Sequence, residues 1–156
     1  MKMLSKATLL AASLALSATA NAVDITKPAK NGYHQQKVVY HIDDIQMAKA
    51  ALRNVKNHLN ALGDENADII VVTHSSGAFA LVDGAMGKKD KAGKPIDLRD
   101  TIAALANRGV KFEICANTIR GKKIPKQKIN ENATIVPSGV AEIANLEQKG
   151  YVYVKP

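Results

Sequence analysis

The chain has 156 residues, 46% of them hydrophobic and 23% charged, and its 22 basic residues outnumber its 14 acidic ones for a net charge of +8. This apolar content is typical of one packed globular domain, and it excludes a disordered, collagen-like or coiled-coil protein. Much of the positive charge lies in two segments, residues 88–94 and 120–128, which lack interleaved aromatic side chains to stack on nucleic-acid bases. We therefore expect two solvated basic segments and no nucleic-acid partner.

The first 22 residues have the three parts of a secretory signal peptide. Lys2 and Lys6 make a basic start, residues 7–18 are mainly apolar, and residues 20–22 (ANA) have the small side chains that a signal peptidase recognises. The apolar run is too short to span a bilayer, which needs about 20 apolar residues. We therefore expect residues 1–22 to be removed on export to the periplasm, leaving a mature chain without stable membrane insertion.

Beyond this segment, runs rich in β-branched residues alternate with stretches whose apolar residues recur every three and four positions, the spacing of an α-helix. In chain order the predicted elements are an arm at 23–36, a strand at 37–42, a helix at 45–62, a strand at 67–73, a turn at 74–77, a short helix at 78–85, a basic loop at 86–95, a helix at 97–108, a strand at 110–115, mixed loop and helix at 116–130, a strand at 133–137, a helix at 138–149 and a strand at 151–154.

This alternation predicts one α/β domain over residues 37–156, preceded by the arm. Strands joined by helices of crossover length form βαβ units, which build a parallel sheet with helices on both faces. The expected fold class is a three-layer α/β/α sandwich with a five-stranded, mainly parallel sheet. The closing strand at 151–154 (YVYV) is apolar and is expected at a sheet edge, which proteins usually cover or pair. We therefore expect the mature chain to self-associate, with Tyr151 or Tyr153 buried between subunits.

Polar and reactive side chains follow the predicted strands, at the sheet end where ligands of open parallel sheets bind. These residues are His41, Asp43, Asp44, His74, Ser75, Ser76, Cys115, Asn117, Thr118, Ser138 and Gly139.

Cys115 is the only cysteine, so an intramolecular disulfide is impossible. A lone thiol in an exported protein is buried and inert, paired with another molecule, or reactive. Cys115 ends its strand before a predicted helical turn, with Arg120 and Lys122 close behind, and both a helix N-terminus and nearby cations favour the thiolate. Position therefore favours a reactive thiol, although a buried, inert cysteine is also common.

The histidines carry a weaker signal. His74 fits a base, an anion donor or a turn-capping residue, and its spacing alone favours the structural role. His41 is less informative still, because Asp43 and Asp44 beside it are explained as helix caps. The histidines and Cys115 have no metal-ligand spacing, and phosphate-loop and dinucleotide motifs are missing from the sequence, so we expect neither metal nor cofactor.

Two motifs are more specific: Cys-x-Asn-Thr at 115–118, and Pro-Ser-Gly-Val at 137–140 followed by Gly-Tyr-x-Tyr at 150–153. With them the sequence resembles the DsrE/DsrF-like family of small sulfur-relay proteins, especially its exported branch. The matching segments are 38–43 (VVYHID), 52–57 (LRNVKN), 69–74 (IIVVTH), 110–121 (VKFEICANTIRG) and 135–156 (IVPSGVAEIANLEQKGYVYVKP).

The resemblance implies a five-stranded parallel sheet, homo-oligomers such as trimers or hexamers, and a strand-end cysteine that carries sulfur as a persulfide. Cys115 is the matching position. Our leading hypothesis is an exported sulfur carrier, at most a sulfurtransferase, that exchanges sulfane sulfur with a small sulfur compound or a thiol-bearing partner protein. Asn117, Thr118, Arg120 and His74 would bind the substrate. The alternative is a non-catalytic oligomeric binding protein for a small anion or a partner protein, with Cys115 a bystander.

Overall fold

The computed structural model describes residue 28 and residues 30–156. The signal peptide expected at 1–22 lies outside the described residues, as do residues 23–27 and 29 of the arm. The described end of the arm is tied to the first helix, because Asn31 Nδ2 donates a hydrogen bond to the Ala61 carbonyl at 2.9 Å.

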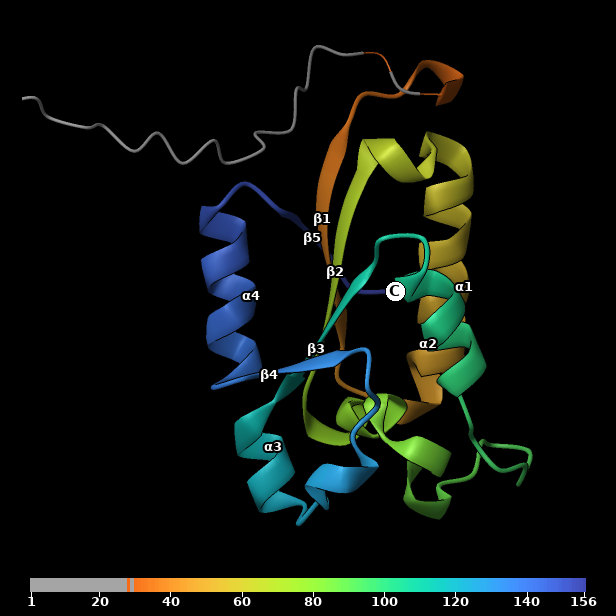
Figure 1. Ribbon diagram of the computed structural model, residues 1–156, viewed down its shortest axis with the longest axis vertical. Coiled ribbons are helices and arrows are strands. Elements are labelled where there is room, and N and C mark those ends of the chain that lie inside the picture. The colour runs from red at the N-terminus through yellow and green to blue at the C-terminus, as the bar shows by residue number, and fades with distance from the viewer. Residues whose placement is uncertain (1–27, 29) are drawn as a thin grey trace, which may run out of the picture.

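A five-stranded sheet forms the middle layer (Figure 1), and all of its strands run parallel in the order β4-β3-β2-β1-β5. The strands are β1 (Gln36–Ile42), β2 (Ala67–Thr73), β3 (Lys111–Cys115), β4 (Ala133–Val136) and β5 (Val152–Val154). The prediction of five strands and a parallel sheet is confirmed, and the bounds differ from the predicted ones by at most one residue at either end. The order also confirms that the closing strand lies at a sheet edge.

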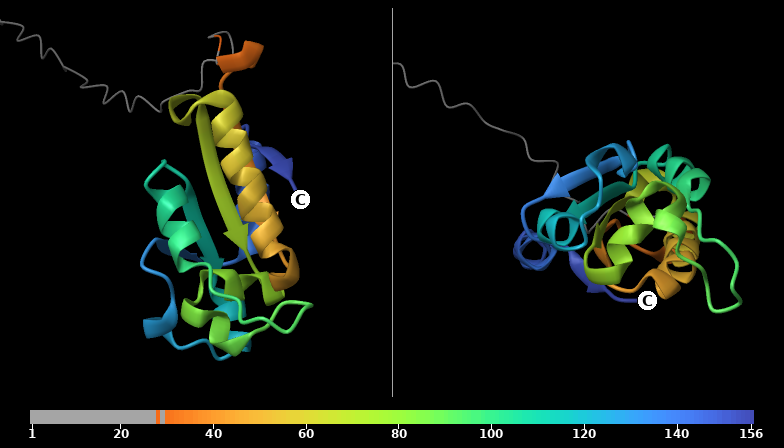
Figure 2. Two further views of the ribbon diagram at one scale, coloured as in Figure 1. Left: turned by 90° about the vertical axis from the view of Figure 1, so that its right-hand side faces the viewer. Right: turned by 90° about the horizontal axis from the view of Figure 1, so that it is seen from below.

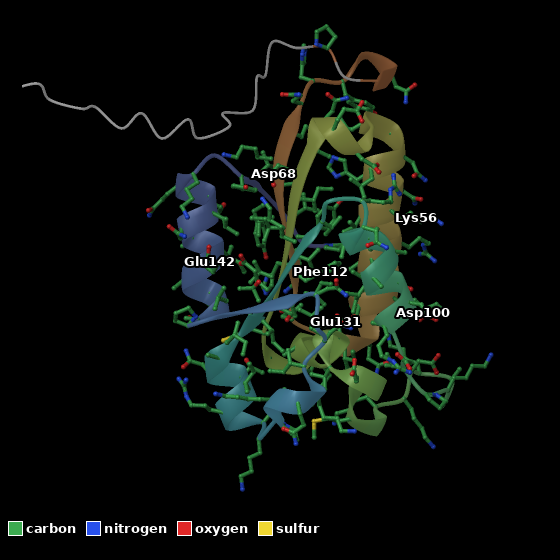
Figure 3. All side chains as sticks on the ribbon, in the orientation of Figure 1. Lys56, Asp68, Asp100, Phe112, Glu131 and Glu142 are labelled. Carbon is green, nitrogen blue, oxygen red and sulfur yellow. The ribbon has the colours of Figure 1, made fainter. Side chains whose placement is uncertain are left out.

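Helices cover both faces of the sheet, so the three-layer α/β/α class is confirmed (Figures 1 and 2). The helices are α1 (Ile45–Leu62), α2 (Arg99–Ala106), α3 (Ala116–Gly121) and α4 (Gly139–Gln148). The larger core lies between the sheet and α1, with Phe112 in it (Figure 3). A smaller core lies under α4 and consists of Val39, Ile70, Val72, Ile143, Leu146 and Tyr151.

Tyr151 corrects one expectation about self-association. Its side chain is only 9% exposed, belongs to the core under α4, and donates a hydrogen bond to Asp68 Oδ2. It therefore packs within its own chain, and of the two tyrosines proposed for a subunit boundary only Tyr153 is exposed.

The predicted helix at 78–85 is wrong. The chain forms two 3₁₀-helices instead, η3 (Ser75–Leu81) and η4 (Asp83–Gly87). Gly84, Ala85 and Met86 all have positive φ values, between 46° and 62°, in the left-handed region that an α-helix cannot include. Apolar spacing could not reveal this turn, because Ala78–Leu81 are buried in the same way that a helix would bury them.

Gly77 joins η3 to the end of β1. Its N–H donates to the Asp43 carbonyl at 2.9 Å, and the N–H of His74 donates to the Ile42 carbonyl at 3.3 Å. A Cβ at residue 77 would lie 2.1 Å from the Ile42 carbonyl oxygen, so only glycine fits. This contact holds the loop after β2 against β1.

Among the described helices, none is long and apolar enough to cross a membrane.

We predict that Gly77→Ala lowers the free energy of unfolding by about 2–3 kcal/mol, because the methyl group forces the two strand ends apart. Gly121→Ala is the matched control, since residue 121 is helical and a Cβ there meets no atom within 4 Å. Urea denaturation measures both variants. Equal stability of the two variants would contradict the role given to Gly77.

Candidate functional site

The carboxyl ends of the strands meet at the end of the sheet that Figure 2 (right) views head-on. Cys115 is the last residue of β3 and immediately precedes α3. Its side chain is buried, with 5% exposed. It pairs in register with Val136, so the chain that leaves β4 passes beside it into α4. The sulfur therefore lies where the first turns of α3 and α4 meet.

Backbone groups from both helices surround the sulfur. Burial is the largest single influence and by itself raises the pKa of the Cys115 thiol. Hydrogen bonds from the N–H groups of Gly139, Thr118 and Asn117, and from the Thr118 side chain, act in the opposite direction and together outweigh it. The pKa of Cys115 is therefore lower than the ordinary thiol value, which is the condition for a nucleophilic thiolate.

The hydroxyl of Thr118 is oriented by the neighbouring loop. Its Oγ1 accepts a hydrogen bond from the Ser75 N–H at 3.1 Å, and a hydroxyl has one proton, which is then free to point at the sulfur. Ser75 has a φ of 52°, in the left-handed region that non-glycine residues seldom adopt. Such strained residues are concentrated at functional sites. Ser75 therefore belongs to the surroundings of Cys115 through its backbone.

Gly139 brings α4 close to the sulfur. A Cβ at this residue would lie 3.3 Å from Cys115 Cβ, 3.2 Å from His74 Cβ and 3.4 Å from His74 Cδ2. These distances are tighter than ordinary van der Waals contacts, so a side chain would push α4 outward. Glycine at the first position of α4 thus lets its N–H reach Cys115, and it also places the His74 ring against the same glycine.

His74, which follows β2, contacts His41 of β1, and His41 in turn contacts Tyr153 of β5. His74 Nε2 lies 2.7 Å from His41 Nε2, and the Tyr153 hydroxyl lies 2.7 Å from His41 Nδ1. The sheet order explains the row, because β2, β1 and β5 are consecutive neighbours. The sequence placed both histidines at this end of the sheet, but it did not reveal their contact or the part of Tyr153, since both depend on the strand order.

Asn117 and Arg120 lie differently from Thr118. Asn117 takes part through its backbone N–H, while its exposed side chain accepts a hydrogen bond from the Arg120 guanidinium. Arg120 is exposed at the end of α3. Both residues therefore border the site on its solvent side, whereas Thr118 contacts the sulfur directly.

Glu113 adds a carboxyl group to the same face of β3, two residues before Cys115. Burial and the nearby Glu142 raise its pKa, while Lys149 and Lys111 oppose that shift. Its Oε2 is buried with no hydrogen-bond partner among the described residues. The parity of β3 thus places Cys115 beside a polar residue, as expected, although the neighbouring face of β2 is apolar.

A metal site and a surface groove would be alternatives to the strand-end site. Among the described residues, no group of three or more His, Cys, Asp and Glu side chains could hold a metal ion. A groove of about 700 Å³ lies between α1, α2 and the loop that precedes α2. Its lining includes neither Cys115 nor the histidines, so it is separate from the strand-end site.

Comparisons with known proteins agree with this architecture. The protein of unknown function MTH1491 from Methanobacterium thermoautotrophicum has a similar structure, with a TM-score of 0.63 and 27% sequence identity over 78% of this chain and 99% of that one. The ychN protein from E. coli has a TM-score of 0.61 over the same shares at 15% identity, a level at which only the fold is shared. The sequence has no match among curated proteins.

The sequence itself matches a family model. The match covers residues 5–156, which include every strand and helix described above and the Cys115 site. The chain therefore belongs to the DsrE/DsrF-like family.

Proposed function

We propose that the protein is a sulfur carrier in which the Cys115 thiolate accepts a sulfane sulfur and passes it on as a persulfide. One observation carries the proposal: the buried sulfur receives hydrogen bonds from two helix N-termini and a hydroxyl, and its pKa is lowered despite burial. A buried cysteine with a purely structural role needs none of these donors. Membership of the family supports the same chemistry, because sulfur relay is known within it.

The reaction is thiol exchange at sulfur and balances without an external oxidant. With thiosulfate as donor, Cys115 Sγ attacks the outer sulfur and a new S–S bond forms. The donor's own S–S bond breaks, and sulfite leaves with the electron pair. In the second half, the thiolate of a partner attacks the outer sulfur of the persulfide, and Cys115 leaves as the thiolate.

The site residues would serve this exchange in different ways. The N–H groups of Gly139, Thr118 and Asn117 would hold the negative charge on Cys115 and, after transfer, on the persulfide. The His74 ring packs against the same glycine as Cys115, and it would take up the thiol proton. Arg120 lies in the last turn of α3, and the lysines between 122 and 128 follow that helix at this end of the sheet (Figure 1). Their charge favours an anionic sulfur donor.

The same N–H groups would also hold a small anion, which makes a non-catalytic binding protein the second candidate. A strand-end cradle of backbone donors is a common form of anion site. The two candidates differ in one respect: only a carrier forms a covalent bond between Cys115 and sulfur.

We expect incubation of the reduced mature protein with thiosulfate or polysulfide to add the mass of one sulfur atom to the intact chain. Cys115→Ser should gain nothing under the same conditions, because its hydroxyl is a poor nucleophile. Intact-protein mass spectrometry reads both. An unmodified wild-type chain would contradict the carrier, and binding of thiosulfate to Cys115→Ser would then favour the anion-binding alternative.

We also propose that the protein is exported and self-associates. The signal-peptide pattern of residues 1–22 supports export, and the exposed edge at β5 supports association. Val152 and Tyr153 there are 64% and 39% exposed, and both lie on a strand with a free hydrogen-bonding edge. Burying such side chains against a second copy would contribute about 2 kcal/mol for each.

Protein recovered from the periplasm of expressing cells is expected to begin at Val23 and to sediment as an oligomer at micromolar concentration under reducing conditions. N-terminal sequencing and sedimentation velocity make the two measurements. A cytoplasmic chain beginning at Met1 would contradict export. A single species of monomer mass at all concentrations would contradict self-association.

A further inference from the structure

Three side chains form a continuous hydrogen-bonded row beside Cys115. The His41–His74 contact and the His41–Tyr153 contact are both 2.7 Å, and the two imidazole rings lie 4.6 Å apart between centroids. The histidines are partly buried, while Tyr153 at the outer end is 39% exposed. The row therefore runs from the interior of the site to the surface at β5.

The proton count of this row is fixed by its geometry. Two ring nitrogens at 2.7 Å must share one proton, because two lone pairs or two N–H groups facing each other would repel. When His74 Nε2 carries that proton, His41 accepts it and His41 Nδ1–H donates to the tyrosine oxygen. The reverse arrangement has His41 Nε2–H donating to His74 and the tyrosine O–H donating to His41. Both directions keep every contact, so a proton can pass along the row without breaking it.

The inner end of the row packs against the same glycine as Cys115. His74 Cδ2, which is bonded to Nε2, would lie 3.4 Å from a Cβ on Gly139, and Cys115 Cβ would lie 3.3 Å from the same point. Gly139 also donates its N–H to the sulfur. Within the described part of the chain, His74 Nδ1 has no hydrogen-bond partner, and it is the nitrogen that can accept a proton when His74 Nε2 carries the shared one.

We propose that His41 and His74 act as a single acid–base group for Cys115, with Tyr153 as the positioning residue that fixes the outer ring. The inference rests on the sulfur-carrier function and names the residues that accept the proton of the Cys115 thiol. Before sulfur transfer the Cys115 S–H bond breaks, its electron pair stays on sulfur, and the released proton is bound by the pair as an N–H on the free nitrogen of His74. The shared proton then shifts to His41, which divides the positive charge between the two rings.

The surroundings of His41 favour its neutral form. Burial, above all, and then the charge of His74 lower the pKa of His41, with a weaker contribution from Lys155 and an opposing one from Asp43. Lys155 Nζ lies 2.6 Å from Asp43 Oδ2, so these two charges largely cancel each other beside the ring. The groups that face His41 are therefore His74, Tyr153, Asp43 and Lys155, and their balance favours the neutral imidazole at neutral pH.

The pair can be observed directly in the mature protein by proton NMR. A proton held between two nitrogens at this distance gives a sharp low-field signal, which we expect in wild type. His41→Gln should abolish it, because the glutamine side chain fills the space but does not titrate. His58→Gln is the matched control, since His58 is a partly buried histidine that is hydrogen-bonded to Tyr40 and Gln36, outside the site. The low-field signal of the His41–His74 proton should remain in this variant. A wild-type spectrum without the signal, or its persistence in His41→Gln, would overturn the pair.

The pH dependence of Cys115 alkylation by iodoacetamide tests the acid–base role. At low pH the pair already holds its extra proton and cannot take the one on sulfur, so the rate should rise as the pair deprotonates and again as the remaining thiol ionises. We expect His74→Gln, which lacks the accepting nitrogen, to remove the lower step and to slow alkylation on that plateau by about 10²-fold, and His41→Gln to move the step. Tyr153→Phe keeps both histidines and should move the lower step without removing it. A wild-type profile with one step, or identical profiles for wild type and His41→Gln, would refute the role.

These measurements stand apart from sulfur transfer. A histidine-dependent step in alkylation together with an unmodified Cys115 after exposure to thiosulfate would leave the proton pair in place and refute only the carrier. A sulfur adduct that forms equally fast in wild type and His41→Gln across the pH range would support the carrier and refute the acid–base role of the histidine pair.

Discussion

The cost of ionising a buried sulfur atom is the constraint on which the rest of the site depends. Burial opposes ionisation of Cys115, and only donors placed within hydrogen-bond distance can reverse that effect. The fold supplies them by starting two helices at one point: α3 begins directly after Cys115, and α4 begins at Gly139. The parallel sheet makes this possible, because β3 and β4 are neighbours that end at the same level.

The residues without functional side chains are as important as Cys115 itself. Gly139 lets α4 approach, and Gly77 holds the loop after β2 against the end of β1. That loop carries Ser75, whose N–H orients the Thr118 hydroxyl, and His74, whose ring packs against Gly139. The close approach of backbone to backbone thus sets the positions of the groups around the sulfur.

The sequence predicted the strands and the long helix α1 well, because their patterns are local. The run ADIIVVT has the length and β-branched content of a buried strand, and the apolar spacing from Ile45 to Leu62 describes one face of a helix. The short helix at 78–85 was wrong because left-handed residues at 84–86 leave no mark in an apolar pattern. The row from His74 to Tyr153 could not be predicted either, since its two contacts join residues 33 and 112 positions apart through a strand order that spacing does not encode. Asn117 and Arg120 were placed at the right end of the sheet, but their side chains bind each other and leave the sulfur to backbone groups.

Hydrogen-bond donors lower the pKa of Cys115, and a titration of the thiol measures that effect. The absorbance of the thiolate, taken as the difference between the mature protein and Cys115→Ser, gives the pKa of Cys115. We predict a midpoint below that of an ordinary thiol, and a rise of about one pKa unit in Thr118→Val, since one hydrogen bond to a charged group contributes about 1.5 kcal/mol or more. Thr134→Val, at an exposed position of β4, is the matched control and should titrate like the wild type. A wild-type midpoint at or above the ordinary value, or no change in Thr118→Val, would contradict the account.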